Sequence, residues 1–181
     1  NQAVNYMLSM MNTKRKIVTD EELSKYRFTV PYMYERGLTD ELIEKYDIGV
    51  DMDFVPPGRK RKVPCITFPV KDENGNCLFV ARRSIANKNF FLPEAVEKPV
   101  YGIYELPKNT KSVVICESCF NALTSVKYGK PAVALFGTGN TYQVNQLRRL
   151  GVREFILGFD PDEAGARATR KWKKILRDVA I

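Results

Sequence analysis

The sequence predicts an α/β fold in which an N-terminal α+β subdomain precedes a parallel sheet. Three apolar segments, at residues 113–117, 132–136 and 155–160, are each followed by a segment with helical periodicity. Continuous apolar strands that alternate with amphipathic helices are typical of a parallel sheet covered on both faces. Upstream, two further apolar segments flank Asn74-Gly75, a dipeptide typical of a β-hairpin. Because 44% of the 181 residues are hydrophobic, the chain can bury a substantial core.

We divide the chain at residue 110, where the pattern changes from a hairpin with basic loops to alternating strands and helices. Residues 1–110 are expected to form a basic N-terminal subdomain, and residues 111–181 the parallel sheet with its helices. The chain begins with Asn1 and ends soon after the last predicted helix. We therefore expect a fragment of a longer protein, truncated after the parallel sheet.

The first half of the N-terminal subdomain is predicted to be helical. Thr19 precedes three acidic residues, which is typical of a helix N-terminus. Residues 32–46 have the pattern of a helix, a turn and a second helix, in which Gly37 suits the C′ position of the first and Thr39 the N-cap of the second. Packing alone explains this pattern, and no chemistry is visible in it.

The second half is predicted to be a hairpin of strands 65–70 and 77–85, joined by residues 71–76. Side chains of a strand alternate between its two faces. Arg82 and Arg83 therefore point in opposite directions, and at most one of them faces any given site.

Cations exceed acids in this chain. There are 29 Lys and Arg residues against 21 Asp and Glu, which gives a net charge of +8 and a pI near 9.3. This excess favours a polyanionic partner such as a nucleic acid. The densest cluster lies in a loop before the hairpin, where a solvated surface and a phosphate-binding surface remain open as interpretations. The candidate nucleic-acid-binding residues are Arg59, Lys60, Arg61, Lys62, Arg82, Arg83, Lys88 and Lys98.

Two of the apolar strands of the C-terminal part end in acidic residues. Glu117 follows the first strand, and Asp160 and Asp162 follow the third. The carboxyl ends of neighbouring parallel strands meet at one edge, where open α/β sheets bind ligands. We therefore predict a divalent-metal site there, with Glu117, Asp160 and Asp162 as its ligands. Asp162 also suits the N-cap of the following helix, predicted at residues 163–176, and such a cap does not exclude metal binding.

Other catalytic chemistry is restricted by the composition. The chain has no histidine, which excludes Ser-His-Asp and Cys-His catalysis. Cys116 and Cys119 have the spacing of a zinc site, but one belongs to an apolar strand and the other to the start of a helix. We predict that both of them, and Cys65 and Cys77, are buried free thiols.

Together these motifs resemble a Toprim domain, and within that fold the DnaG-type primases of bacteria and phages. The Toprim features are Glu117 after the first strand, Phe136-Gly137-Thr138-Gly139 after the second, and the segment 159–165 after the third. The N-terminal half agrees with a primase RNA-polymerase domain through its signatures at residues 34–39, 46–49, 68–82 and 98–102. The resemblance covers roughly residues 30 to 176.

The resemblance implies DNA primase activity, which is metal-dependent synthesis of RNA primers on a single-stranded DNA template from ribonucleoside triphosphates. It implies Mg²⁺ or Mn²⁺ as cofactor, held or oriented by Glu117, Asp160 and Asp162. Arg82, Lys88 and Lys98, with Arg83 as a weaker candidate, would hold phosphates of the template or of the incoming nucleotide. A replicative helicase is an expected partner through regions outside this chain.

The chain departs from the family pattern after the first strand. The usual motif is Glu-Gly-x-x-Asp, whereas this chain has Ser118 in place of the glycine and Asn121 in place of the second acid. Two alternatives therefore stay open. One is a Toprim enzyme of another kind, such as a topoisomerase or a nuclease. The other is a degenerate, non-catalytic primase-like module of a phage or mobile element that binds nucleic acid.

No apolar segment approaches the roughly 20 residues needed to span a bilayer. We expect no membrane partner, and a location in the cytoplasm of a bacterial cell or a phage-infected host.

Overall fold

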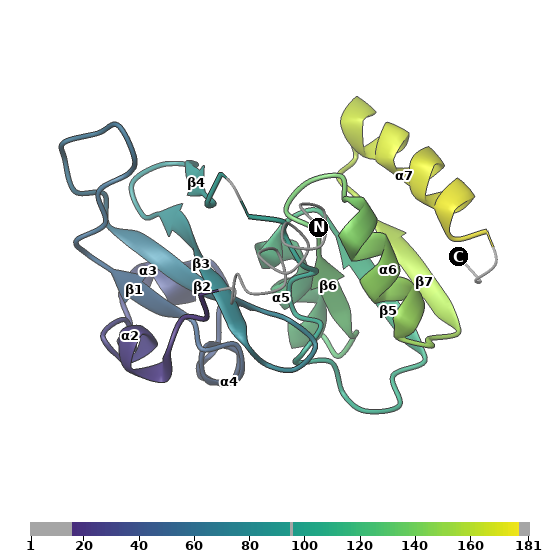
Figure 1. Cartoon of the computed structure of the whole chain (residues 1–181), viewed down its shortest axis with the longest axis horizontal. Coiled ribbons are helices and arrows are strands. Elements are labelled where there is room, and N and C mark those ends of the chain that lie inside the picture. Colours follow the sequence, from purple (N-terminus) through teal and green to yellow (C-terminus); the bar gives the residue numbers. More distant parts are fainter. Residues whose placement is uncertain (1–15, 95, 178–181) are drawn as a thin grey trace, which may run out of the picture.

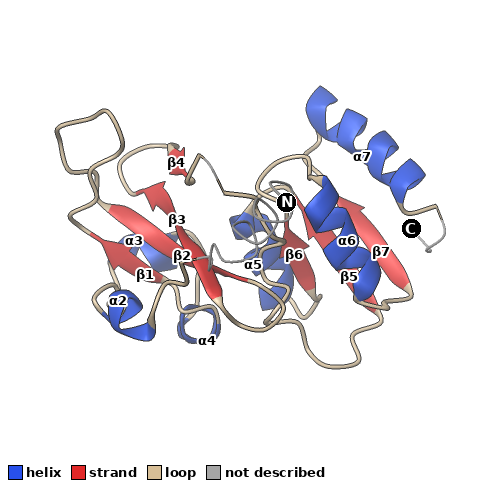
Figure 2. Ribbon diagram, in the orientation of Figure 1, coloured by secondary structure: helices blue, strands red, loops and turns tan. Residues whose placement is uncertain are grey.

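Two sheets lie side by side along the length of the molecule, each with its own helices (Figures 1 and 2). This computed structural model describes residues 16–94 and 96–177. Sheet A is antiparallel, has the strand order β1-β2-β3-β4 and belongs to the N-terminal half. Sheet B is parallel, has the order β6-β5-β7 and belongs to the C-terminal half. The predicted α/β class, with an α+β part followed by a parallel sheet, is confirmed.

Sheet A is built around the predicted hairpin. Its connection bends at Gly75, which has a positive φ of 85°, and the Asp72 carboxylate accepts hydrogen bonds from the backbone N–H groups of Asn74 and Asn76. Two short outer strands complete the sheet and were not predicted. The strands are β1 (Gly49–Asp51), β2 (Cys65–Lys71), β3 (Cys77–Ser84) and β4 (Phe90–Phe91).

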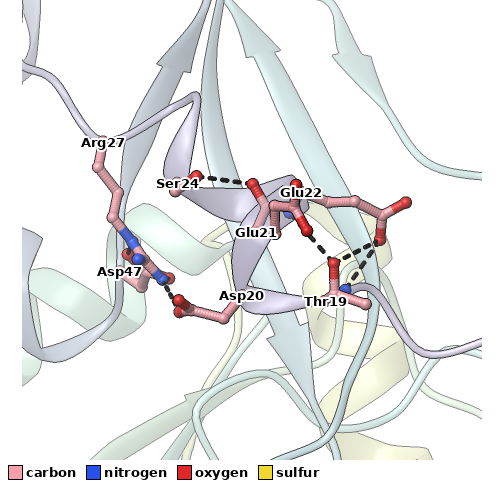
Figure 3. A network of polar contacts seen from close by, with 7 residues as sticks. All are labelled: Thr19, Asp20, Glu21, Glu22, Ser24, Arg27 and Asp47. Atoms are coloured by element: carbon pink, nitrogen blue, oxygen red, sulfur yellow. Dashed lines mark hydrogen bonds and ion pairs between the residues drawn. The ribbon is translucent and has the colours of Figure 1, made fainter.

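Three short helices accompany sheet A, and side chains fix their ends as predicted. Thr19 and Glu22 form a reciprocal capping box at the first of them, and Thr39 caps the third by accepting from the N–H of Leu42. Arg27 pairs with Asp20 and with Asp47, which ties the first helix to the segment before β1 (Figure 3). The helices are α2 (Asp20–Ser24), α3 (Pro31–Glu35) and α4 (Asp40–Lys45).

Sheet B alternates with helices in the predicted order. Its central strand β5 pairs with β6 on one side and with β7 on the other, both in parallel. The boundaries lie within one or two residues of the predicted ones. The elements are β5 (Ser112–Cys116), α5 (Cys119–Lys127), β6 (Ala132–Ala134), α6 (Thr141–Arg149), β7 (Glu154–Gly158) and α7 (Glu163–Ile175).

Helices cover both faces of sheet B because its side chains alternate. Val113 and Ile115 of β5 join a core with Leu147 of α6 and Trp172 of α7. Cys116, at the end of the same strand, joins a different core, to which α5 contributes. This second core also contains the inner face of sheet A and helices α3 and α4, so it spans both halves of the chain.

An aromatic contact marks the centre of this shared core. The ring of Phe68, on β2, packs edge-on against Phe120, on α5, with 5.4 Å between their centroids. Tyr101 lies on the segment that joins the two sheets, and its backbone forms an isolated bridge with Ala134 of β6. The predicted division at residue 110 therefore falls between the two sheets, but the hydrophobic core runs across it.

The four cysteines are free and buried, as predicted. Burial raises the pKa of the Cys116 thiol to about 11 and that of Cys119 to about 12. Both thiols are therefore protonated at neutral pH, and the zinc interpretation has no support in the residues described. Within residues 16–94 and 96–177, no helix has both the length and the apolar character that a membrane crossing requires.

Candidate functional site

Glu117 and Asp160 meet at the carboxyl edge of sheet B. Strands β5 and β7 are neighbours in register, with Cys116 opposite Gly158. Glu117 follows β5 directly, and Asp160 lies two residues beyond the end of β7. The backbone N–H of Asp160 donates a hydrogen bond of 3.3 Å to Oε1 of Glu117. The predicted convergence of these two acids is thus present in the structure.

Asp162 lies in the same turn, but its side chain is engaged by the following helix. Its Oδ1 accepts a hydrogen bond of 2.7 Å from the N–H of Gly165, which makes it the N-cap of α7. The turn packs so closely on this helix that a Cβ atom at Gly165 would lie 1.8 Å from the carbonyl oxygen of Asp160. Glycine is therefore required here, and the helix fixes the direction in which Asp160 leaves the sheet.

The charged form of Glu117 is disfavoured in this site. Burial raises the pKa of Glu117, and the charges of Asp160 and Asp162 raise it further, while the hydrogen bond from the N–H of Asp160 opposes the shift. A proton or a cation between the carboxylates would relieve this repulsion. The site is therefore predisposed to bind a cation.

The side chains at this edge are of the chemical type that binds a hard divalent cation. Carboxylate oxygens are the ligands that Mg²⁺ prefers, and Mg²⁺ keeps several waters, so two protein carboxylates are sufficient to bind it. Among the residues that the structure describes, however, no group of three or more acidic or cysteine side chains is arranged to hold a metal ion. Glu117 and Asp160 are the pair that the structure brings into contact. Only Oδ1 of Asp162 is engaged by the N-cap bond, so Asp162 stays a predicted third ligand.

Asn121 completes the acidic edge in place of the acid of the family pattern. Its Nδ2 donates a hydrogen bond of 3.2 Å to Oδ1 of Asp160. The helix that carries Asn121 is held at this edge by Ser118, whose hydroxyl accepts from the N–H of Asn121. A neutral amide thus supports Asp160 without adding a third negative charge.

A cavity of about 430 Å³ opens beside the acids, between the two sheets. Glu117 and Asp160 line it together with two cations from the N-terminal half, Arg36 and Arg83. Arg36 lies with its guanidinium 4.4 Å from the centroid of Phe120, a stacking contact that positions its charge. Arg36 belongs to the signature at residues 34–39, but it was not among the predicted site residues.

Lys98 lies close to this cavity. Its Nζ donates a hydrogen bond of 3.3 Å to the carbonyl oxygen of Phe136, and Phe136 and Gly137 line the cavity. Phe136 has a positive φ of 54°, a conformation that costs a bulky residue energy and is concentrated at functional sites. The backbone N–H of Gly137 donates a hydrogen bond to the carbonyl oxygen of Glu117. This bond holds the loop after β6, here called the β6 loop, against the acidic edge.

Arg82 and Arg83 point to opposite faces of sheet A, as predicted, and they contact different residues. Arg83 lines the cavity and donates from Nε to the carbonyl of Asn87. Arg82 forms an ion pair of 3.0 Å with Asp51, in which the side chains are only 18% and 10% exposed. Arg82 was the stronger predicted candidate, but its charge is compensated by Asp51. Of the two arginines, Arg83 is the one that lines the cavity with the acids.

The remaining predicted cations are exposed and lie outside the cavity. Lys88 is in the turn between β3 and β4. In the basic loop, Arg59 lies 5.9 Å from the ring centroid of Phe91, and Lys62 pairs with Asp53 at 2.7 Å. A second hollow is lined by Arg59 together with Phe54 and Phe91. The structure therefore groups Arg59 with aromatic rings, while Lys60 and Arg61 extend into solvent.

Comparison with known proteins first defines the class. Residues 114–181 match the Toprim-like family. This match begins within β5 and includes Glu117, Asp160 and Asp162. The C-terminal part of the chain is therefore similar to Toprim-like domains.

More specifically, similar proteins are DNA primases. A DNA primase of Borreliella burgdorferi is 27% identical over 188 residues, which cover 94% of this chain and 35% of the relative. A structure of the DnaG catalytic core matches with a TM-score of 0.71 at 19% identity, covering 86% of this chain and 64% of that one. A DnaG primase catalytic domain bound to single-stranded DNA matches with a TM-score of 0.66 at 19% identity, covering 86% and 66%. The predicted resemblance to DnaG-type primases is confirmed, and the chain spans about a third of the length of the curated relatives it matches.

Proposed function

We propose that the chain is the catalytic core of a DNA primase, which synthesises RNA primers on single-stranded DNA from ribonucleoside triphosphates. The observation that carries this proposal is the pair of Glu117 and Asp160, which lines the same cavity as Arg36 and Arg83. Nucleotidyl transfer requires acids and cations around one cavity, because the metal-bound triphosphate needs partners of both signs. The relatives named as primases support the same activity.

Glu117 and Asp160 are proposed to hold Mg²⁺ or Mn²⁺, with Asp162 fixing the turn that carries Asp160. When bound, the divalent cation would neutralise the triphosphate and stabilise the attacking and leaving oxygens. Asn121 would orient Asp160 through its amide hydrogen bond.

Cations around the cavity are proposed to hold phosphates. Arg83 and Arg36 line the same cavity as the acids and would bind the triphosphate of the incoming nucleotide. Arginine suits this role because its planar guanidinium can make two parallel hydrogen bonds to a phosphate. Lys98, which lies against the β6 loop, would add a further charge there.

The template is proposed to lie on the outer part of sheet A. The basic loop at residues 59–62 and Lys88 supply charge for a phosphate backbone, and the rings of Phe54 and Phe91 beside Arg59 supply surfaces on which bases stack. A DnaG primase catalytic domain bound to single-stranded DNA has a similar fold, which supports single-stranded DNA as the ligand. Contact with a replicative helicase through other parts of the protein, and a cytoplasmic location, stay predictions.

The test is primer synthesis on single-stranded templates with labelled ribonucleotides and Mn²⁺. It compares the wild type with Asp160→Asn, both in this chain and in the full-length reading frame that contains it. A matched control is Glu44→Gln, which removes an exposed acid from α4. We expect synthesis to be lost in Asp160→Asn and kept in Glu44→Gln.

Template binding, followed by fluorescence anisotropy, separates the enzyme from a non-catalytic module. Asp160→Asn is expected to bind single-stranded DNA as well as the wild type does. If the wild-type full-length protein makes no product while it still binds DNA, the enzyme proposal fails and the non-catalytic alternative replaces it. At present that alternative is not favoured, because the two acids are retained and the similar proteins are primases.

A further inference from the structure

Helix α7 presents a basic face to which the proposed function assigns no role. The helix carries five cations and a single acid. Its apolar side, which includes Ala168 and Trp172, is buried in the core with α6 and sheet B. Figure 1 shows α7 at the end of the molecule opposite sheet A, so this face is separate from the basic loop already considered.

Helical spacing collects the cations into one stripe. Arg167, Arg170 and Lys174 are three and four residues apart and therefore share one face of the helix, opposite Trp172. Lys171 and Lys173 flank this stripe, and all five residues are exposed. At a rise of about 1.5 Å per residue the stripe is about 10 Å long.

Most of this charge is not compensated within the protein. Arg167 pairs with Glu163, the only acid of the helix, at 3.0 Å. Within the part of the chain that the structure describes, Arg170, Lys173 and Lys174 have no ion-pair or hydrogen-bond partner. The excess is not a general property of the helices either, because α4 has three acids and one lysine.

The chemistry of the stripe matches the backbone of a nucleic-acid duplex. A duplex carries one phosphate per about 3.4 Å along each strand, so a stripe of about 10 Å faces about three phosphates of one strand. Single-strand binding surfaces combine cations with aromatic side chains on which bases stack. The sole aromatic residue of α7, Trp172, is fully buried, so this face offers charge without a stacking surface.

The position of the helix agrees with this partner. α7 begins immediately after the turn of Asp160 and Asp162, and the N-cap bond of Asp162 to Gly165 joins the two rigidly. The N-terminal end of α7 therefore adjoins the acidic edge. The hollow with Phe54 and Phe91 lies on sheet A, on the other side of the cavity.

We propose that the exposed basic face of α7, formed by Arg167, Arg170, Lys171, Lys173 and Lys174, binds the phosphate backbone of a nucleic-acid duplex without regard to sequence. If the proposed function holds, that duplex is the RNA–DNA hybrid made at the acidic edge. Only this identification of the duplex rests on the proposed function. The template strand before synthesis uses sheet A, and the product uses α7.

The test measures the salt dependence of binding by fluorescence anisotropy. The probes are a labelled RNA–DNA hybrid of 20 base pairs and its DNA strand alone, each between 50 and 200 mM salt. The variant Arg170→Gln/Lys173→Gln/Lys174→Gln removes three exposed charges without changing a buried residue. The control variant Lys108→Gln/Lys111→Gln/Lys130→Gln removes the same charge at the opposite edge of sheet B, before β5 and β6.

For three phosphate contacts, the slope of log K against log salt is expected to become shallower by about 2.7 with the hybrid. Over this fourfold salt range, that change means that the variant loses about 40-fold less affinity than the wild type does. The control is expected to keep the wild-type slope, and the single strand is expected to respond little to either variant. Arg170→Lys alone, which keeps the charge, should behave as the wild type.

Three outcomes would overturn the proposal. An unchanged slope in the α7 variant, with its urea midpoint also unchanged, removes this face from the binding surface. Equal effects of the two triple variants mean that only net charge matters. An equal loss with the single strand means that the face does not select a duplex. Because binding is measured without synthesis, failure here leaves the primase proposal untouched, and failure of synthesis leaves this test intact.

Discussion

Arg82 is predicted to stabilise the fold, and Arg83 to serve the site, although the two are neighbours in sequence. Arg82 donates from Nε to Asp51 at 3.0 Å and from its terminal nitrogens to the hydroxyl of Tyr26 and the carbonyl of Val80. Its guanidinium also lies 4.6 Å from the ring centroid of Phe54. Asp51 is 8% exposed, so Arg82→Gln would leave a nearly buried carboxylate without its counter-charge.

Removal of one partner of a buried ion pair costs about 3 to 5 kcal/mol. With an m-value of about 2 kcal/mol/M in urea, the midpoint of unfolding is expected to fall by about 1.5 to 2.5 M. Arg83→Gln is the matched control. Arg83 has one hydrogen bond, to the carbonyl of Asn87, and its loss is expected to shift the midpoint by less than about 0.5 M, because such a bond is worth about 1 kcal/mol or less.

Urea unfolding, followed by the fluorescence of the single tryptophan, measures both variants. The double variant Asp51→Asn/Arg82→Gln should recover part of the lost stability, because it removes the uncompensated charge. In primer synthesis the order should reverse, with Arg83→Gln more impaired than Arg82→Gln at temperatures where both are folded. A stable but inactive Arg82→Gln variant would refute the reasoning and make Arg82 a site residue.

Three further predictions follow from particular contacts. Burial raises the pKa of Glu105, so the folded state favours the protonated acid. The stability that this group contributes is present at low pH and is lost as the pH rises through the folded-state pKa. Glu105→Gln should therefore raise the unfolding temperature at pH 7 and not at pH 4. Gly139 has a φ of 92°, and a Cβ atom there would lie 2.4 Å from the ring of Trp172, so Gly139→Ala should cost about 2 to 5 kcal/mol in urea unfolding. Asn121→Ala removes the hydrogen bond to Asp160 and should weaken Mn²⁺ binding, measured by electron paramagnetic resonance, by about tenfold or more.

Each of these predictions has a contradicting result. A gain of equal size at both pH values would show that Glu105→Gln acts through something other than ionisation. A Gly139→Ala variant as stable as the wild type would mean that the loop can move away from the indole. Unchanged Mn²⁺ affinity in Asn121→Ala, with an unchanged unfolding midpoint, would remove Asn121 from the support of the metal site.

The elements that follow from local pattern were predictable. The strands and helices from residue 112 onward alternate with clear periodicity, and the hairpin is marked by Asn74-Gly75, so their order and approximate bounds agree with the structure. Strands β1 and β4 were not predicted. They have three and two residues, too few for a periodic signal, and they exist because β2 and β3 offer them free edges to pair with.

The part of the candidate site that depends on the strand order of sheet B was predictable. The meeting of Glu117 and Asp160 follows from two parallel strands, once these are neighbours. The cations that face the acids depend instead on how sheet A packs against sheet B, which no local pattern encodes. Strand alternation separates Arg82 from Arg83 but does not say which of them faces the acids, and Arg36 reaches the cavity from a helix far away in sequence.

The edge-on packing of Phe68 against Phe120 has a consequence for the order in which the nascent chain folds. Sheet A is complete in sequence by residue 91, yet part of its hydrophobic face is covered by α5, which begins at residue 119. During synthesis, this face waits until some thirty further residues have been translated and have left the ribosome. Exposed apolar surface of this kind is where partly made chains aggregate. Expression of the N-terminal half alone would make that transient exposure permanent.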